Sequence, residues 1–118
     1  MQLRMNTRIQ DGVLVLDCIG RIVFGEESAA LRDTVKSAME GNASVVLNLA
    51  EVNYIDSGGL GTLVSLYTTA RNAGGALKLA NLTKRVGDLL QVTKLVSVFE
   101  VFPDEAAALR SFKKQAIA

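Results

Sequence analysis

Apolar and polar residues alternate in two ways along the chain, and the first pattern predicts the strands of a sheet. Short runs that are apolar throughout, or apolar at every second position, are typical of strands. Such runs lie at residues 3–10, 13–19, 44–49, 76–80 and 96–102. Asp11 and Gly12 separate the first two runs with a two-residue turn signal, which predicts a β-hairpin. Residues 20–25 are apolar with a glycine at each end, and predict a short extended segment leading out of the sheet.

The second pattern, in which apolar residues recur three and four positions apart, predicts amphipathic helices between the later strands. The first helix is expected from Ser28, as N-cap, to about residue 39, and the second over residues 58–73. A third is expected after a cap at Asn81 or Thr83. The last is expected from residues 103–105 onward, with Ala108, Leu109 and Phe112 facing inward. We therefore expect an α/β fold with a mixed, mostly parallel sheet of about four to five strands and about four helices packed on it. Residues 1–118 are expected to form a single domain.

Composition and charge narrow the classes of function. With 49% apolar residues, 21% charged residues and a net charge of +1, the chain has no electrostatic reason to bind nucleic acid or anionic lipid. No apolar run is long enough to span a membrane, and the first residues lack the apolar core of a signal peptide. We therefore expect a cytoplasmic protein that does not insert into membranes.

The absence of histidine removes several kinds of chemistry at once. Without histidine, Ser-His-Asp catalysis, Cys-His catalysis and the common zinc sites are excluded. The one cysteine, Cys18, lies in an apolar stretch and is expected to be a buried thiol rather than a reactive one. We expect neither an enzymatic activity nor a cofactor or metal.

The candidate chemistry lies between the apolar run 44–49 and the helix predicted over residues 58–73. Asp56 and Ser57 are both good N-cap residues, and the glycines at 58, 59 and 61 let the backbone turn tightly. The Ser57 hydroxyl is thus expected at or beside a helix N-terminus, where free N–H groups and the helix dipole favour an added anion. A modifiable hydroxyl is one interpretation of Ser57, and a plain helix cap is the other. For Asp56, the alternatives are a second cap or a role in orienting Ser57.

The predicted helix after this loop separates core positions from candidate surface positions. Leu63 and Tyr67 are expected to face the core. The opposite face is expected to be exposed and to offer a partner surface, or merely a solvated one; it carries Thr62, Ser65, Thr69 and Arg71. Gly58 and Gly59 would present a flat surface that a partner can approach closely.

The sequence VLNL at residues 46–49, followed by IDSGGLG at residues 55–61, resembles the signature of STAS domains, and specifically of bacterial anti-sigma factor antagonists. The resemblance extends over nearly the whole chain, from the hairpin to the apolar pair Leu89 and Leu90. It implies a monomer or weak dimer that binds an anti-sigma factor, often a serine kinase, and so releases a sigma factor. It also implies that the kinase phosphorylates Ser57, that the phosphorylated protein no longer binds, and that a phosphatase restores it. The partner-binding residues implied are Asp56, Ser57, Gly58, Gly59, Thr62 and Ser65. With a kinase as partner, Asp56 has a further possible role in engaging the metal of that kinase.

Two positions depart from the pattern of the family. Many antagonists carry a second hydroxyl residue directly after the phosphoacceptor, where this chain has Gly58. The family also often carries an acid a few residues after the glycine of the second strand, where this chain has Val23. These departures bear on the partner kinase and on the efficiency of phosphorylation more than on the fold.

Two further interpretations remain open at the level of sequence. One is a STAS scaffold that is not phosphorylated and that works in a transport or signalling assembly, which Val23 favours. The other is a module that binds a nucleotide or another small ligand through the glycines at 58, 59 and 61. The glycine pattern is neither the dinucleotide fingerprint nor a P-loop, and no lysine follows it.

Overall fold

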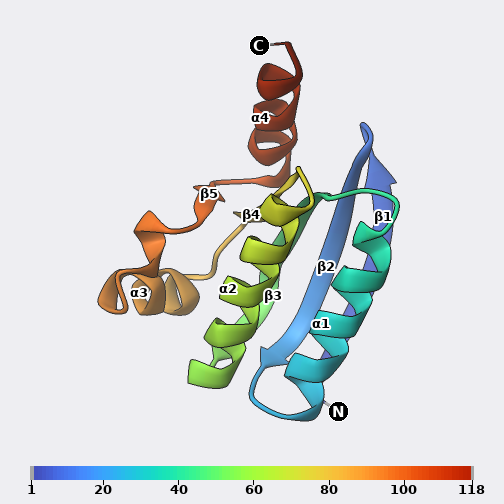
Figure 1. Cartoon of the computed structure of the whole chain (residues 1–118). Coiled ribbons are helices and arrows are strands. Elements are labelled where there is room, and N and C mark those ends of the chain that lie inside the picture. Colours follow the sequence, from blue (N-terminus) through green and yellow to red (C-terminus); the bar gives the residue numbers. More distant parts are fainter. Residues whose placement is uncertain (1, 118) are drawn as a thin grey trace.

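The computed structural model describes residues 2–117 and shows a five-stranded mixed sheet with the strand order β1-β2-β3-β4-β5. The strands are β1 (Leu3–Gln10), β2 (Val13–Ile22), β3 (Ser44–Ile55), β4 (Ala76–Ala80) and β5 (Glu100–Phe102). β1 pairs antiparallel with β2, and all the other neighbours are parallel (Figure 1). The predicted α/β class, the hairpin and the mostly parallel sheet are confirmed.

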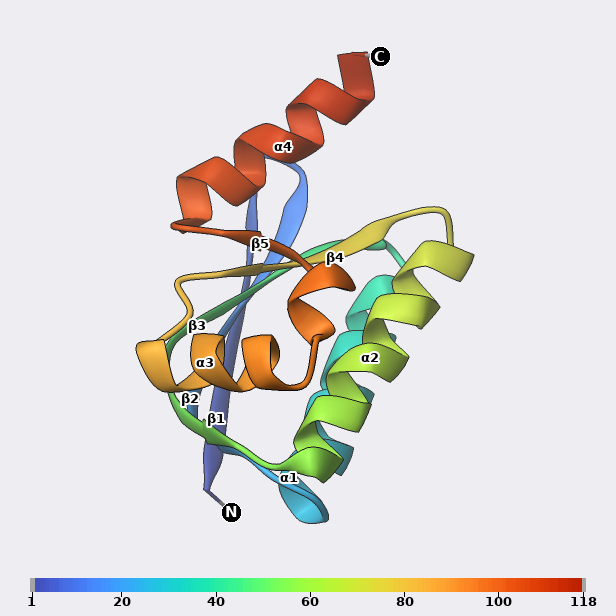
Figure 2. The same ribbon diagram turned by 90° about the vertical axis from the view of Figure 1, so that its left-hand side faces the viewer.

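Helices cover both faces of this sheet. They are α1 (Glu26–Met39), α2 (Ser57–Asn72), α3 (Lys84–Val92) and α4 (Glu105–Ile117), with a short 3₁₀ helix, η1 (Leu95–Ser97), after α3. α1, α2 and α3 bury their apolar faces in one cluster with the strands, whereas α4 packs on the opposite face (Figure 2). Within residues 2–117, no helix combines the length and the apolar character that crossing a lipid bilayer requires.

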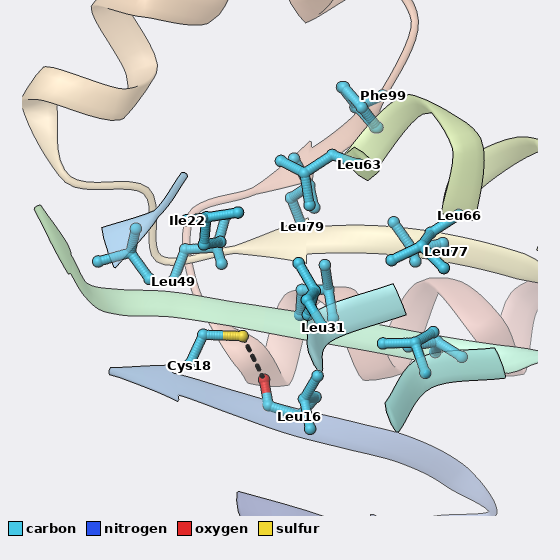
Figure 3. Close-up of a cluster of buried hydrophobic side chains, with 14 of the residues drawn as sticks. Leu16, Cys18, Ile22, Leu31, Leu49, Leu63, Leu66, Leu77, Leu79 and Phe99 are labelled. Atoms are coloured by element: carbon cyan, nitrogen blue, oxygen red, sulfur yellow. Dashed lines mark hydrogen bonds between the residues drawn. The ribbon is translucent and has the colours of Figure 1, made fainter. Parts of the chain in front are cut away.

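The main core lies between the sheet and the three helices α1, α2 and α3. Leu31 of α1 and Leu66 of α2 are fully buried in one cluster with strand side chains such as Leu77 (Figure 3). Cys18 is 1% exposed in this core, and its thiol donates a long hydrogen bond of 3.9 Å to the Leu16 carbonyl. Burial raises the pKa of the Cys18 thiol to about 12, so the neutral thiol is favoured, and the prediction that Cys18 is buried is confirmed.

The central strands are longer than the sequence predicts. β3 runs to Ile55 rather than ending near residue 49, and β2 continues to Ile22. The two ends pair with each other, with Ile22 beside Ile55, after two register shifts in the β2–β3 ladder. The prediction that residues 20–25 leave the sheet is therefore wrong for 20–22, because a parallel partner strand satisfies their backbone groups. This extension carries both strands to the edge where α1 and α2 begin.

One helix prediction and one strand prediction need correction, and the structure decides between the two caps predicted for α3. α1 starts at Glu26 behind Gly25, so Ser28 is not its N-cap; the Ser28 hydroxyl lies inside the first turn and donates to the Val23 carbonyl at 2.7 Å. Of the alternatives for α3, Thr83 is the cap, because its hydroxyl accepts from the Val86 N–H. The run 96–102 is a strand only over Glu100–Phe102, because a left-handed residue, Lys94 with φ 66°, starts a 3₁₀ turn in its place.

The face under α4 combines a small apolar cluster with charged groups. Ala108 and Leu109 are buried against the sheet as predicted, with Phe112 half-buried beside them. The side chain of Lys78 is fully buried beneath α4, where its ammonium donates to the Ser111 hydroxyl at 2.7 Å and lies 4.1 Å from the centre of the Phe112 ring. A second ionic group, in which the Arg8 guanidinium lies between Asp17 and Glu105, ties the hairpin to the first turn of α4.

Candidate functional site

Asp56 is the residue that organises the junction between β3 and α2. It is the N-cap of α2, with extended backbone angles, and its Oδ1 accepts from the Gly59 N–H at 2.8 Å. The same carboxylate accepts from the Phe24 N–H at 3.0 and 3.1 Å. These hydrogen bonds, that from Gly59 above all, hold the pKa of Asp56 below its usual range, so the group is ionised at neutral pH. Asp56 therefore fastens the start of α2 to the β2–α1 loop (residues 23–25).

Ser57 is exposed and is the first residue of α2. Because Asp56 is the cap, the plain-cap interpretation of Ser57 does not apply. Within the described residues, the Ser57 hydroxyl makes no hydrogen bond, so it is available to solvent or to a partner. The helix N-terminus beside it is less open to an anion than the sequence suggests, because the Asp56 carboxylate already accepts from the Gly59 N–H.

Gly58 and Gly59 are required by close packing. A Cβ at Gly58 would lie 2.5 Å from the Cβ of Phe24, and a Cβ at Gly59 would collide with the backbone carbonyl of Ile22. Gly59 is buried and Gly58 is half-buried, so only Gly58 contributes to a surface that a partner could approach. This packing accounts for both glycines without a bound phosphate.

The surface expected on α2 is only partly present. Ser65 is exposed as predicted, but the prediction that Thr62 is exposed is wrong. Thr62 is 4% exposed, and its hydroxyl donates to the Gly58 carbonyl at 3.2 Å, one turn earlier in the helix. Leu63 is buried as expected, and Tyr67 is half-buried against Phe99.

A groove of about 430 Å³ lies between the first turns of α1 and α2, beside Ser57. We call it the α1–α2 groove; it is lined by Phe24, Gly25, Ser28, Arg32, Gly58, Gly61, Thr62 and Ser65. Figure 1 shows that both helices begin at the same end of the molecule, with the β2–α1 loop between them. No local pattern marks Phe24, because the hydrogen bond that holds its backbone at Asp56 joins residues 32 positions apart in the chain. Arg32 comes to the groove from α1 through the packing of the two helices.

Two other features complete the site. Val23 occupies the position at which the family often has an acid. Its backbone carbonyl accepts from the Ser28 N–H at 3.1 Å and thus fixes the β2–α1 loop. In the part of the chain that the structure describes, no group of three or more acidic or cysteine side chains is placed to hold a metal ion. The site consists of one exposed hydroxyl, one ionised carboxylate and a mixed apolar and cationic groove.

The mixed sheet, with an exposed serine where β3 meets α2, defines a small α/β domain of a known kind. A family model for the STAS domain matches residues 4–108, so the chain belongs to the STAS domain family. It is 33% identical over 102 residues to the anti-sigma-B factor antagonist of Listeria monocytogenes, covering 82% of this chain and 90% of that protein.

The anti-sigma-B factor antagonist of Bacillus subtilis is 34% identical over 71 residues, which is 60% of this chain and 65% of that protein, slightly less than two thirds of its length. Among solved structures, an anti-sigma factor antagonist from Mycobacterium paratuberculosis has the same fold. Its TM-score is 0.79 at 22% identity, covering 92% of each chain.

Proposed function

We propose that this protein is an anti-sigma factor antagonist that binds an anti-sigma factor of the serine kinase type and is switched off by phosphorylation of Ser57. The observation that carries the proposal is the exposed, unbonded hydroxyl of Ser57 at the start of a rigidly capped helix. The two relatives named above are both antagonists of an anti-sigma-B factor, which supports this class of partner. A phosphatase restores the active form, and the protein acts in the cytoplasm without catalysis of its own.

The electrostatics of the loop favour a switch that acts on the partner surface. A phosphate on Ser57 adds about −1.5 to −2 charge next to the ionised Asp56 carboxylate. The exposed side of Ser57 faces solvent, so the fold can accommodate the added group. A partner that closes over the loop must instead desolvate the phosphate beside a second negative charge, which disfavours binding. The switch then needs no refolding.

A titration with purified components tests the proposal. Wild type, Ser57→Ala and Ser57→Asp are titrated against each anti-sigma factor of the source organism, with affinity measured by calorimetry. We expect Ser57→Ala to bind within about threefold of wild type and Ser57→Asp to bind at least about tenfold more weakly, since a like-charge contact costs more than about 1.4 kcal/mol. Ser37→Asp places the same charge on an exposed serine in α1 outside the groove lining and is the matched control.

Phosphorylation itself needs a separate measurement. Incubation with the partner kinase and ATP, followed by peptide mapping, is expected to place a single phosphate on Ser57 and none on the Ser57→Ala variant. Equal binding by Ser57→Ala and Ser57→Asp would refute the charge switch. Binding without any phosphorylation, in vitro and in cells under growth and stress, would support a scaffold that is not phosphorylated.

A further inference from the structure

The side chain of Phe24, just before the start of α1, faces solvent rather than the core. Phe24 is 80% exposed, the largest exposed fraction among the big apolar side chains that the structure describes. Exposing an aromatic ring forgoes the hydrophobic stabilisation that burial would provide. Aromatic residues held at the surface in this way are enriched at the centres of protein interfaces.

Phe24 is exposed on a backbone that is held at several points. Its N–H donates to Asp56, the preceding Val23 carbonyl accepts from the N–H and the hydroxyl of Ser28, and the following Gly25 carbonyl accepts from the Ala29 N–H. The ring is thus carried by a segment that is fastened to both α1 and α2. Binding through such a segment loses little backbone entropy, which favours affinity.

Phe24 also lies against both residues that flank the serine of the proposed switch, since its N–H donates to Asp56 and its side chain stands next to Gly58. Its Cβ stands so close to Gly58 that no side chain fits between them. From there Phe24 forms one wall of the α1–α2 groove, and Arg32 lines the same groove from α1. Arg32 forms no ion pair within the described residues, and none of the eight residues lining the groove carries a carboxylate.

We propose that Phe24 and Arg32 form the anchor of the partner interface: Phe24 inserts into an apolar pocket of the anti-sigma factor, and Arg32 pairs with a carboxylate at the rim of that pocket. This inference rests on the proposed function and names the residues that give the interface its affinity. The cationic, carboxylate-free groove selects an acidic partner surface by charge complementarity. Phosphorylation of Ser57 then acts at the edge of the anchored contact, where added bulk and charge separate the two surfaces.

The test uses the anti-sigma factor that wild type binds in the titration above, as purified protein. Phe24→Ala is expected to weaken binding roughly ten- to thirtyfold, the effect of losing a central aromatic contact. Ile9→Ala is the matched control, because Ile9 is 64% exposed on β1 near the hairpin turn, at the other end of the molecule. It is expected to change affinity less than about twofold.

Arg32→Glu is expected to weaken binding about tenfold, and Arg32→Lys to stay within about threefold of wild type. Thermal unfolding of each variant checks that the fold is intact.

The outcomes separate this inference from the proposed function. If Ser57→Asp loses binding while Phe24→Ala binds as well as wild type, the anchor is refuted and the charge switch stands. If wild type binds no anti-sigma factor, the proposed function fails and the anchor fails with it. If the wild-type chain self-associates and Phe24→Ala abolishes that association, the ring belongs to a contact between two copies, which also overturns the proposal.

Discussion

The face of the sheet under α1, α2 and α3 is packed with aliphatic side chains, whereas the face under α4 combines a small apolar cluster with buried and half-buried charges. The first face holds the large core and, at one end, the serine and the groove. The second face places the fully buried Lys78 and the Arg8 ion pairs between strand and helix. The difference indicates that α1–α3 supply most of the free energy of folding, while polar contacts fix where α4 lies.

The largest effect on the free energy of unfolding is expected from truncating one buried leucine on each face of the sheet to alanine. Leu66 of α2 is fully buried and Leu109 of α4 is 7% exposed, so the pair compares the two cores directly. We expect Leu66→Ala to lower the free energy of unfolding by roughly 3–5 kcal/mol and Leu109→Ala by about 2 kcal/mol, because the smaller cluster offers fewer contacts to lose. Urea denaturation measures both. Equal losses would show that α4 packs as tightly as α2.

A smaller effect is expected from removing the aspartate that caps a helix on each face. Asp56 caps α2 and also holds Phe24, while Asp104 accepts the Ala107 N–H at 2.8 Å at the start of α4. We expect Asp56→Ala to cost about 1–2 kcal/mol and Asp104→Ala about 0.5–1 kcal/mol, since only the first also releases a loop. A larger cost for Asp104→Ala would contradict the role given to Asp56.

The Asp56 cap also predicts a pH dependence. Its folded-state pKa is depressed by backbone hydrogen bonds, so the stability it contributes is present above the unfolded pKa of about 4 and is lost as the pH falls through the folded value. The difference in unfolding free energy between wild type and Asp56→Asn should therefore be largest at neutral pH and shrink in acid.

The smallest effect is expected at Lys78. Replacing it with Met keeps the shape of the side chain and removes a charge that burial makes costly, while Glu100, 44% exposed, stays in contact with water. We expect Lys78→Met to be neutral or stabilising by about 1 kcal/mol. Burial lowers the pKa of Lys78, so the unfolded state binds its proton more readily, and the unfolding free energy of wild type should rise relative to that of Lys78→Met as the pH approaches about 10. The raised pKa of Cys18 lowers stability in alkali, but this contribution is common to both proteins and cancels in the difference.

A matched lysine on the surface checks this interpretation. Lys84 is 89% exposed and pairs with Asp88 in α3. Measured relative to Lys78→Met, Lys84→Met is expected to show the same alkaline rise in unfolding free energy as wild type. A difference in unfolding free energy between wild type and Lys78→Met that stays constant up to about pH 10 would contradict this interpretation.

The sequence predicted those parts of the molecule that depend on local pattern. The hairpin, β4 over Ala76–Ala80 and the α2 helix follow from periodicity and turn residues. The end of β3 did not, because its outer half is stabilised by pairing with β2, which no local pattern records. The run 96–102 has a strand-like composition, but only its last three residues form a strand. The earlier part contains a 3₁₀ turn and Phe99, which is buried in the core. Local propensity is overridden where a segment has few neighbours in the sheet.

The residues of the site also divide into those that local sequence predicts and those that depend on tertiary packing. Asp56 and Ser57 were located by their cap chemistry and their place between strand and helix. Which of the two is the cap depended on geometry, as did the burial of Thr62 and Gly59. Phe24 could not be identified, because its position at the start of α2 results from the hydrogen bond between the β2–α1 loop and Asp56. Arg32 could not be identified either, because the groove that it lines forms only when α1 and α2 pack side by side.

The space that Phe24 takes above Gly58 determines how the proposed switch responds to its input. A side chain at position 58 would need Phe24 to move, so this loop cannot gain a second phosphoacceptor there without remodelling its neighbour. With Thr62 buried, Ser57 is the one exposed serine or threonine over residues 51–64. Under the proposed switch, each molecule would carry one phosphate in this loop or none. As long as neither enzyme is saturated, the active fraction would follow the ratio of kinase to phosphatase activity as a gradual curve, without the sharp threshold that several sites on one molecule create.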